Sequence, residues 1–193
     1  MQNRFLPLAA LSFLALAACD TMDETWSDMW GDDRPIASSG TGMASGCPQV
    51  AVVRDLSIYQ NPPAANESNL ILTARMGHIK GGCSADGGNV TVNSTVDFVA
   101  LRGDKSASTR ASLPFFVSVL DTQDNVVSKK VYEVPVDFEN NAKDVRITSP
   151  IEASFAVKSG EDATGYRVLL GFHLSAEQVD ANTRFFSQMP GVQ

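Results

Sequence analysis

The chain has 193 residues and a formal net charge of −7, with 22 acidic side chains against 15 lysines and arginines. This length suits one ordinary domain, with room for a small second one. The acidic balance excludes nucleic acid and anionic lipid headgroups as favoured partners, because both would repel the chain.

The first residues have the layout of a secretory signal peptide. Arg4 precedes an uncharged apolar run over residues 5–16, and two small residues then precede a cysteine. The sequence Leu16-Ala17-Ala18-Cys19 resembles the lipobox of bacterial lipoproteins. The resemblance implies that residues 1–18 are removed and that Cys19 carries diacylglycerol, with a further acyl chain such as palmitate on its amino group. A plain signal peptide cut at an Ala-x-Ala site, or an uncleaved short anchor, is the alternative.

This resemblance implies a cell-envelope protein that is anchored to a membrane through Cys19 and faces the periplasm. Several acyl chains anchor a protein more firmly than one does. Asp20 resembles the signal that retains enteric lipoproteins in the inner membrane, but the sorting rule differs between bacterial groups, so the choice between inner and outer membrane stays open. The globular part is similar to small alphaproteobacterial lipoproteins, a resemblance that does not indicate any particular activity.

Residues 19–46 have the composition of a flexible acidic tether. Six acidic residues stand against one arginine in its first half, and Ser, Gly, Ala and Thr dominate the second half. Helical spacing would place two tryptophans and two methionines on one side of a short helix. Tryptophan favours membrane interfaces and interaction hot spots. The predicted partner or membrane contacts are Met22, Trp26, Met29 and Trp30. A disordered tether whose indoles pack loosely on the domain is the alternative.

Three cysteines are present. With Cys19 assigned to lipidation, Cys47 and Cys83 form an even pair in an exported chain, where disulfides persist. We predict a Cys47–Cys83 disulfide, which contributes about 3.8 kcal/mol in the simple chain-entropy picture. Two buried free thiols are the alternative. Zinc is disfavoured because neither cysteine has a CxxC partner or a histidine at ligand spacing.

Residues 47–193 have the pattern of an all-β domain. Short runs with period two are separated by Gly, Asn, Asp and Pro, which predicts about seven strands. The expected strands cover residues 50–58, 70–76, 90–100, 115–119, 132–138, 145–157 and 166–174. Residues 84–88 are an expected loop and residues 122–125 a hairpin turn. Pro135 cannot donate a ladder hydrogen bond, so it predicts an edge or a bulge.

A short helix is expected at the end of the chain. Ser175 and Gln178 have capping-box spacing, and Pro190 stops the helix after Phe186 or Met189. Together these elements predict an immunoglobulin-like or fibronectin-like antiparallel β-sandwich with a short C-terminal α-helix.

The sequence contains no catalytic motif and only two histidines. His78 and His173 lie on separate expected strands; with Asp97 or Asp121 they could hold a cation, although solvated histidines are the more common case. Residues 121–125 resemble a fragment of a calcium loop but lack its glycine and its distal glutamate, so a hairpin turn explains them better. We expect no enzymatic activity, no cofactor and no metal.

The function expected from these features is that of a lipid-anchored, non-enzymatic module for protein interaction or envelope structure. The phenylalanine-rich hairpin and the tryptophan-bearing tether are the candidate surfaces for an envelope protein partner. The alternative is a lipoprotein that binds a small ligand or a glycan, because sandwiches host such sites on their end loops. Loops 60–68, 84–88 and 102–111 contain no aromatic residue, which disfavours this alternative.

Overall fold

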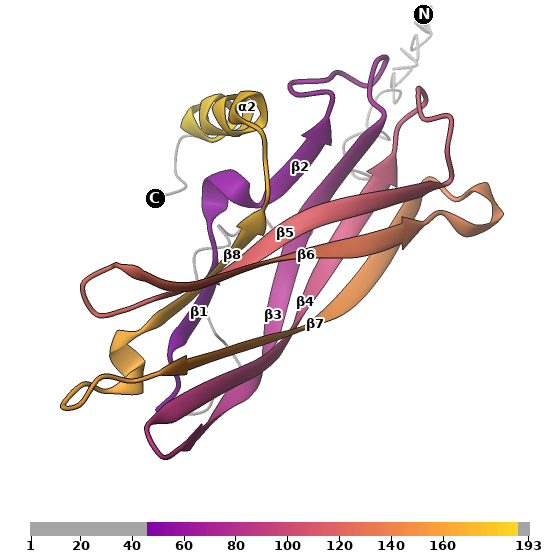
Figure 1. The fold of residues 1–193 in the computed structure, drawn as a ribbon. Helices are drawn as coiled ribbons and strands as arrows, with labels where there is room; N and C mark the ends of the chain where they lie inside the picture. Colours follow the sequence, from indigo (N-terminus) through magenta and orange to yellow (C-terminus); the bar gives the residue numbers. More distant parts are fainter. Residues whose placement is uncertain (1–45, 189–193) are drawn as a thin grey trace, which may run out of the picture. The chain divides into compact units, whose positions relative to one another are not determined.

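A computed structural model describes residues 46–188 (Figure 1). Eight strands form two four-stranded sheets that pack as a β-sandwich, and one short helix follows the last strand. The prediction of an all-β, immunoglobulin-like or fibronectin-like sandwich with a short C-terminal helix is therefore confirmed. The predicted signal peptide and lipidation site lie outside the described residues.

The first sheet contains one parallel pair and two antiparallel pairs. Its strands, in spatial order, are β1 (Gln49–Val52), β8 (Arg167–Phe172), β5 (Arg110–Leu120) and β6 (Val126–Asp137). The parallel pair joins β1 to β8 and brings together strands from the two ends of the domain. β6 is an outer strand that pairs only with β5.

The second sheet is antiparallel throughout. Its strands, in spatial order, are β2 (Ile58–Asn61), β3 (Leu72–Asp86), β4 (Asn89–Arg102) and β7 (Asp144–Ala156). The β5–β6 hairpin crosses in front of β3, β4 and β7 in Figure 1. Immunoglobulin-like sandwiches share such a two-sheet architecture without always sharing one strand order.

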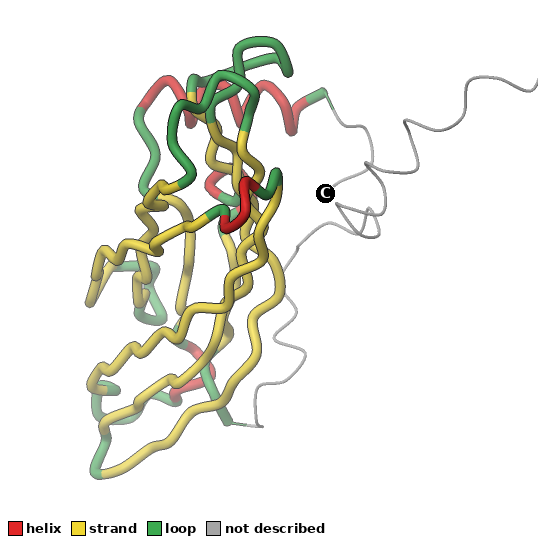
Figure 2. The backbone as a smooth tube through the Cα atoms, turned by 90° about the vertical axis from the view of Figure 1, so that its right-hand side faces the viewer, coloured by secondary structure: helices red, strands yellow, loops and turns green. Residues whose placement is uncertain are grey.

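Helical segments are short and sit between or after the strands (Figure 2). They are the 3₁₀ turns η1 (Arg54–Leu56), η2 (Glu139–Asn141) and η3 (Ala163–Gly165), and the helix α2 (Ala176–Ser187). The predicted capping box of α2 is confirmed, because the Ser175 hydroxyl accepts from the Gln178 amide and the Gln178 side chain accepts from the Ser175 amide. Within residues 46–188, no helix has the length and apolar character needed to cross a membrane.

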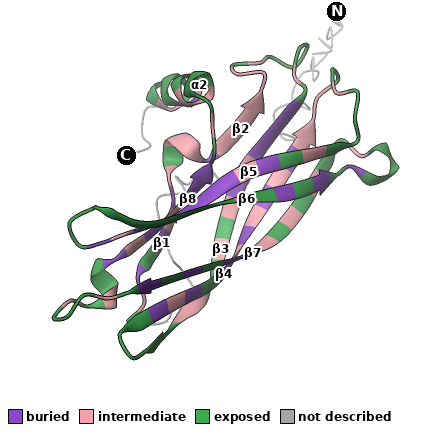
Figure 3. Cartoon of the chain, viewed as in Figure 1, coloured by how far each residue is buried: buried purple, intermediate pink, exposed green. Residues whose placement is uncertain are grey.

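Aromatic side chains dominate the core between the sheets. The Phe98 ring of β4 lies 5.3 Å from the Phe115 ring of β5 and 5.8 Å from the Phe172 ring of β8, measured between centroids. The Phe155 and Tyr166 rings stack at 5.0 Å nearer one end. Large buried rings of this kind supply most of the apolar area in a small sandwich. Along β4, buried positions alternate with positions that are mostly partly exposed (Figure 3).

Several expected strand boundaries are wrong. β5 begins at Arg110 and β6 at Val126, ahead of the expected residues 115 and 132. The run 50–58 is two strands in different sheets, because η1 turns the chain from β1 in the first sheet to β2 in the second. The expected loop 84–88 shrinks to a turn at Gly87 and Gly88, since Ser84 and Asp86 pair with β4. Both glycines have positive φ, 57° and 84°, which suits a tight hairpin turn.

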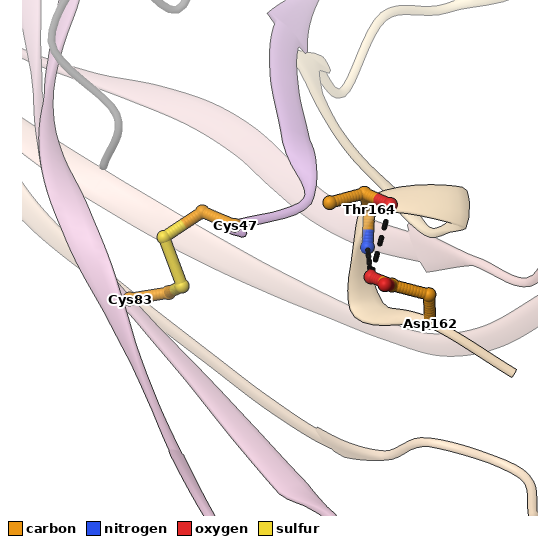
Figure 4. The surroundings of a disulfide bond; sticks show 4 residues. All are labelled: Cys47, Cys83, Asp162 and Thr164. Carbon is orange, nitrogen blue, oxygen red and sulfur yellow. Dashed lines mark hydrogen bonds between the residues drawn. A yellow bond between two sulfur atoms is a disulfide. The ribbon is translucent and has the colours of Figure 1, made fainter. Parts of the chain in front are cut away.

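The predicted Cys47–Cys83 disulfide is present (Figure 4). It joins the residue just ahead of Pro48 and β1 to the far half of β3, across a sequence separation of 36. The bridge therefore links the two sheets. It lies next to β1, which is held in the first sheet by only four residue pairs with β8.

Candidate functional site

The residues predicted to contact a membrane or a partner lie outside the described part of the chain. They are the lipidation residue Cys19 and the tether side chains Met22, Trp26, Met29 and Trp30. Their roles remain predictions.

The histidines do not assemble a metal centre. His78 is exposed on β3 of the second sheet, and His173 is exposed just after β8 of the first sheet. The Asp97 carboxylate accepts a hydrogen bond from the Thr148 hydroxyl at 2.7 Å. Among residues 46–188, no group of three His, Cys, Asp or Glu side chains is arranged to hold a metal ion.

Asp121 organises the turn of the β5–β6 hairpin. Its side chain is 2 % exposed, and its Oδ1 accepts from the backbone amides of Gln123 and Asn125 at 3.0 and 2.9 Å. Its Oδ2 accepts from the Lys158 ammonium at 2.6 Å. The hydrogen bond from Lys158, followed by the one from the Asn125 amide, holds the pKa of Asp121 well below its usual range. Residues 121–125 are thus a hairpin turn, as the sequence favoured, rather than part of a calcium loop.

The same ion pair ties this turn to the connection between β7 and β8. The Tyr166 hydroxyl donates to Glu161 Oε2 at 2.6 Å and accepts from the Lys158 backbone amide at 3.1 Å. Arg167, at the start of β8, pairs with Asp124 of the turn. The end of the hairpin from which β6 departs is therefore held in place by several contacts to neighbouring segments.

The first part of β6, residues 126–133, is the candidate site, and we name it the β6 edge segment. Val126, Val127 and Val131 are 61, 46 and 48 % exposed, and they are three of the five large apolar side chains that are exposed in the described chain. Farther along the strand, Val134 and Val136 are buried. Figure 3 shows the exposed stretch of β6 beside the buried β5. Exposed apolar side chains grouped in this way mark interaction sites.

The segment is exposed because the core ends at β5 along this part of the hairpin. Val117 and Val119 of β5 belong to the core, but the residues opposite them on β6 are Lys130 and Ser128. Within the segment, Tyr132 is the residue that packs against the core, and its ring stacks on Phe115 at 5.2 Å. The Tyr132 hydroxyl donates to the Glu152 carbonyl of β7 at 3.1 Å, so the two sheets meet at this point along their edges.

Two lysines lie in the middle of the β6 edge segment. The Lys129 ammonium lies 4.6 Å from the centroid of the Phe116 ring, and the Lys130 ammonium lies 4.9 Å from that of Tyr132. Such cation–π contacts hold a charge in place without neutralising it. Across residues 46–188, neither lysine forms an ion pair with a carboxylate. Because neighbouring strand residues point to opposite faces, one ammonium lies on each face.

The other outer strands are less suited to binding a partner along their edge. β1 and β2 have four residues each. β7 is long, but its exposed positions are mostly polar and its Glu152 carbonyl already accepts from Tyr132. Proteins commonly protect a free edge by shortness, by proline and by lysine. β6 carries two lysines and Pro135, but its first part also combines length, exposed valines and an unpaired side in a way that the other edges of the described sandwich do not.

A shallow cavity of about 410 Å³ lies at one end of the sandwich, between residues 105–108 and the ends of β2 and β5. Its lining includes Tyr59 and Phe138. Its polar groups are largely engaged within the protein, because Arg110 pairs with Asp137 at 3.1 Å and the Ser106 and Ser108 hydroxyls donate to backbone carbonyls. It therefore offers few free polar groups to orient a small ligand.

Comparison of the chain with protein-family models, with curated proteins and with solved structures finds no match. Within the described sandwich, the β6 edge segment is the feature that best supports a functional site.

Proposed function

We propose that the protein is a lipid-anchored envelope protein that acts as a non-enzymatic interaction module and binds an extended segment of a protein partner along β6. The lipobox resemblance at Cys19 supports the anchor, and the β6 edge segment supports the interaction. The single observation that carries the interaction is an unpaired strand edge with exposed valines at positions 126, 127 and 131.

Strand addition explains why apolar side chains would be left exposed on an edge strand. An added strand gains affinity from main-chain hydrogen bonds and specificity from the side chains at alternate positions. Covering one half-exposed valine contributes roughly 1 kcal/mol through the hydrophobic effect. Pairing with β5, which has one register shift near Val126, and the turn held by Asp121 and Lys158 keep β6 in place before the partner arrives, which lowers the ordering cost of binding.

The proposal is tested by site-specific photo-crosslinking in cells that express the full chain. A photoreactive amino acid is placed at Val127, Lys129 or Val131, and at Arg146 on the exposed face of β7 as the control. Mass spectrometry then locates the attachment point on the partner.

We expect the three β6 positions to attach to a single segment of one partner, with the attachment point advancing by two residues for each step of two along β6. This register is the signature of a strand pair. Attachment points that are scattered over the partner, or yields at β6 no higher than at Arg146, would contradict the proposed function.

A further inference from the structure

We infer that the segment added to β6 is acidic and comes from a different protein rather than from a second copy of this chain. The inference rests on the proposed function, because it concerns the same edge. It names the chemistry of the partner, which the exposed valines alone leave open.

The local charge of the β6 edge segment favours an acidic partner. Lys129 and Lys130 form a doubly positive site on a chain whose net charge is −7. Each ammonium is held over an aromatic ring, and within the described sandwich neither has a carboxylate partner. The one carboxylate in the same segment, Glu133, accepts from the Ser112 hydroxyl at 2.8 Å on the side of β5. The positive charge is therefore available to a molecule that approaches the free edge.

Like charges oppose the pairing of β6 with β6 of a second copy. An antiparallel pair of β6 edges that matches Val127 with Val131 in both directions places Lys129 directly opposite Lys129 of the second copy. Directly opposed like charges destabilise a strand pair. A register centred on Val131 shifts the pairing to residues 127–135, where Pro135 lacks an N–H group. The edge thus disfavours a second copy in these two registers.

An acidic strand that pairs with this edge would need a specific order of residues. In the antiparallel register, an apolar residue lies opposite Val131, acidic residues lie opposite Lys130 and Lys129, and apolar residues lie opposite Val127 and Val126. The two carboxylates point to opposite faces of the partner strand, so each meets one lysine. A short segment of this kind covers the valines and neutralises both ammonium groups at once.

The experiment uses the full chain in detergent micelles and end-blocked, fluorescently labelled peptides. The acidic peptide is valine-glutamate-glutamate-serine-valine-valine flanked by threonines, and the basic peptide has lysine in place of both glutamates. Each is also made with its sequence reversed, which covers parallel addition. Affinity is measured by fluorescence anisotropy at low and at high salt.

We expect the acidic peptide to bind about tenfold more tightly than the basic one at low salt, because two cross-strand charge pairs change sign between them. The double variant K129E/K130E should invert this preference. The control K80E/K105E, which changes the net charge equally at two exposed lysines elsewhere, should retain it. High salt should reduce the preference in every variant.

Three outcomes would overturn the inference. Equal affinity for the two peptides would exclude selectivity for acidic segments but would be compatible with strand addition. If neither peptide binds, the proposed residue pattern of the partner is wrong, and the crosslinking register then tests the proposed function separately. A photo-crosslink from Val127 to the region around Val131 of a second copy would show that the edge pairs with itself.

Discussion

The Lys158 ammonium lies 2.6 Å from Oδ2 of Asp121 and joins the β5–β6 turn to the segment between β7 and β8. Asp121 is buried, whereas Lys158 is half exposed, so the carboxylate depends on this contact, on two backbone amides and on the side-chain amide of Asn125 for its hydrogen bonds. Because β6 begins directly after this turn, the pair also fixes the direction in which the β6 edge segment leaves the hairpin.

Replacing Asp121 by Asn should therefore lower the free energy of unfolding and weaken its dependence on acid pH. The folded state depresses the pKa of Asp121, so its contribution is present above the unfolded value of about 3.9 and is lost as pH falls through the lower folded value. The wild-type protein should lose stability below about pH 5, and D121N should lose less over the same range.

Urea denaturation followed by circular dichroism at a series of pH values measures this effect. Asp180→Asn, at an exposed position on α2, is the matched control and should preserve the wild-type behaviour. If D121N and the wild type change in parallel below pH 5, another carboxylate is responsible.

Replacing Val127 and Val131 by Thr should reduce partner crosslinking from position 129 without loss of the fold. Both valines are exposed, so the free energy of unfolding should change by no more than about 0.5 kcal/mol. Ile71→Thr removes a third exposed apolar side chain at a different place and should leave the yield unchanged. An equal loss of yield in the Ile71 variant would mean that the effect is not specific to β6.

Replacing Cys47 and Cys83 by Ser should lower the free energy of unfolding by about 2–5 kcal/mol, because the bridge restricts the unfolded chain. Guanidinium denaturation measures this difference. Adding a reductant to the wild-type protein should reproduce the behaviour of the double variant, and it should have no effect on the variant itself. Identical stability with and without the bridge would contradict this expectation.

Replacing Asn182 by Ala should loosen α2 from the second sheet. Its amide donates to the Asp55 and Ile58 carbonyls at 2.9 and 2.8 Å, and their loss costs about 1–3 kcal/mol. Hydrogen exchange should rise in η1 and β2, while Glu177→Ala on the exposed face of α2 should leave it unchanged. Faster exchange throughout the sandwich would instead indicate global destabilisation.

The features that depend on local patterning could be predicted from sequence. The alternation of Val90 to Ala100 predicted β4, and the spacing of Ser175 and Gln178 predicted the start of α2. Cys47 and Cys83, the pair that remains when Cys19 is assigned to the lipobox, predicted the disulfide. Pro135 predicted an edge, and β6 is the outer strand of its sheet.

The features that depend on residues far apart in the chain could not be predicted from sequence. The break at η1 arises because β1 pairs with β8, which lies more than a hundred residues later in the chain, and no glycine or proline marks it. The exposed half of β6 had only a weak signal, the loss of alternation where Ser128, Lys129 and Lys130 interrupt the valines. Its importance emerges only when the opposite residues on β5 are known to be buried.

The position of the disulfide has a mechanical consequence. Cys47 lies just ahead of β1, so tension applied to the chain before it passes through the sulfur atoms into β3 (Figure 4). β3 is joined to β4 along most of its length, and that long ladder resists shear, whereas the four-residue pairing of β1 with β8 would peel apart easily. Force applied to the N-terminal side of Cys47 would therefore be transmitted into β3, which is paired along most of its length, and the edge strand β1 would stay in place.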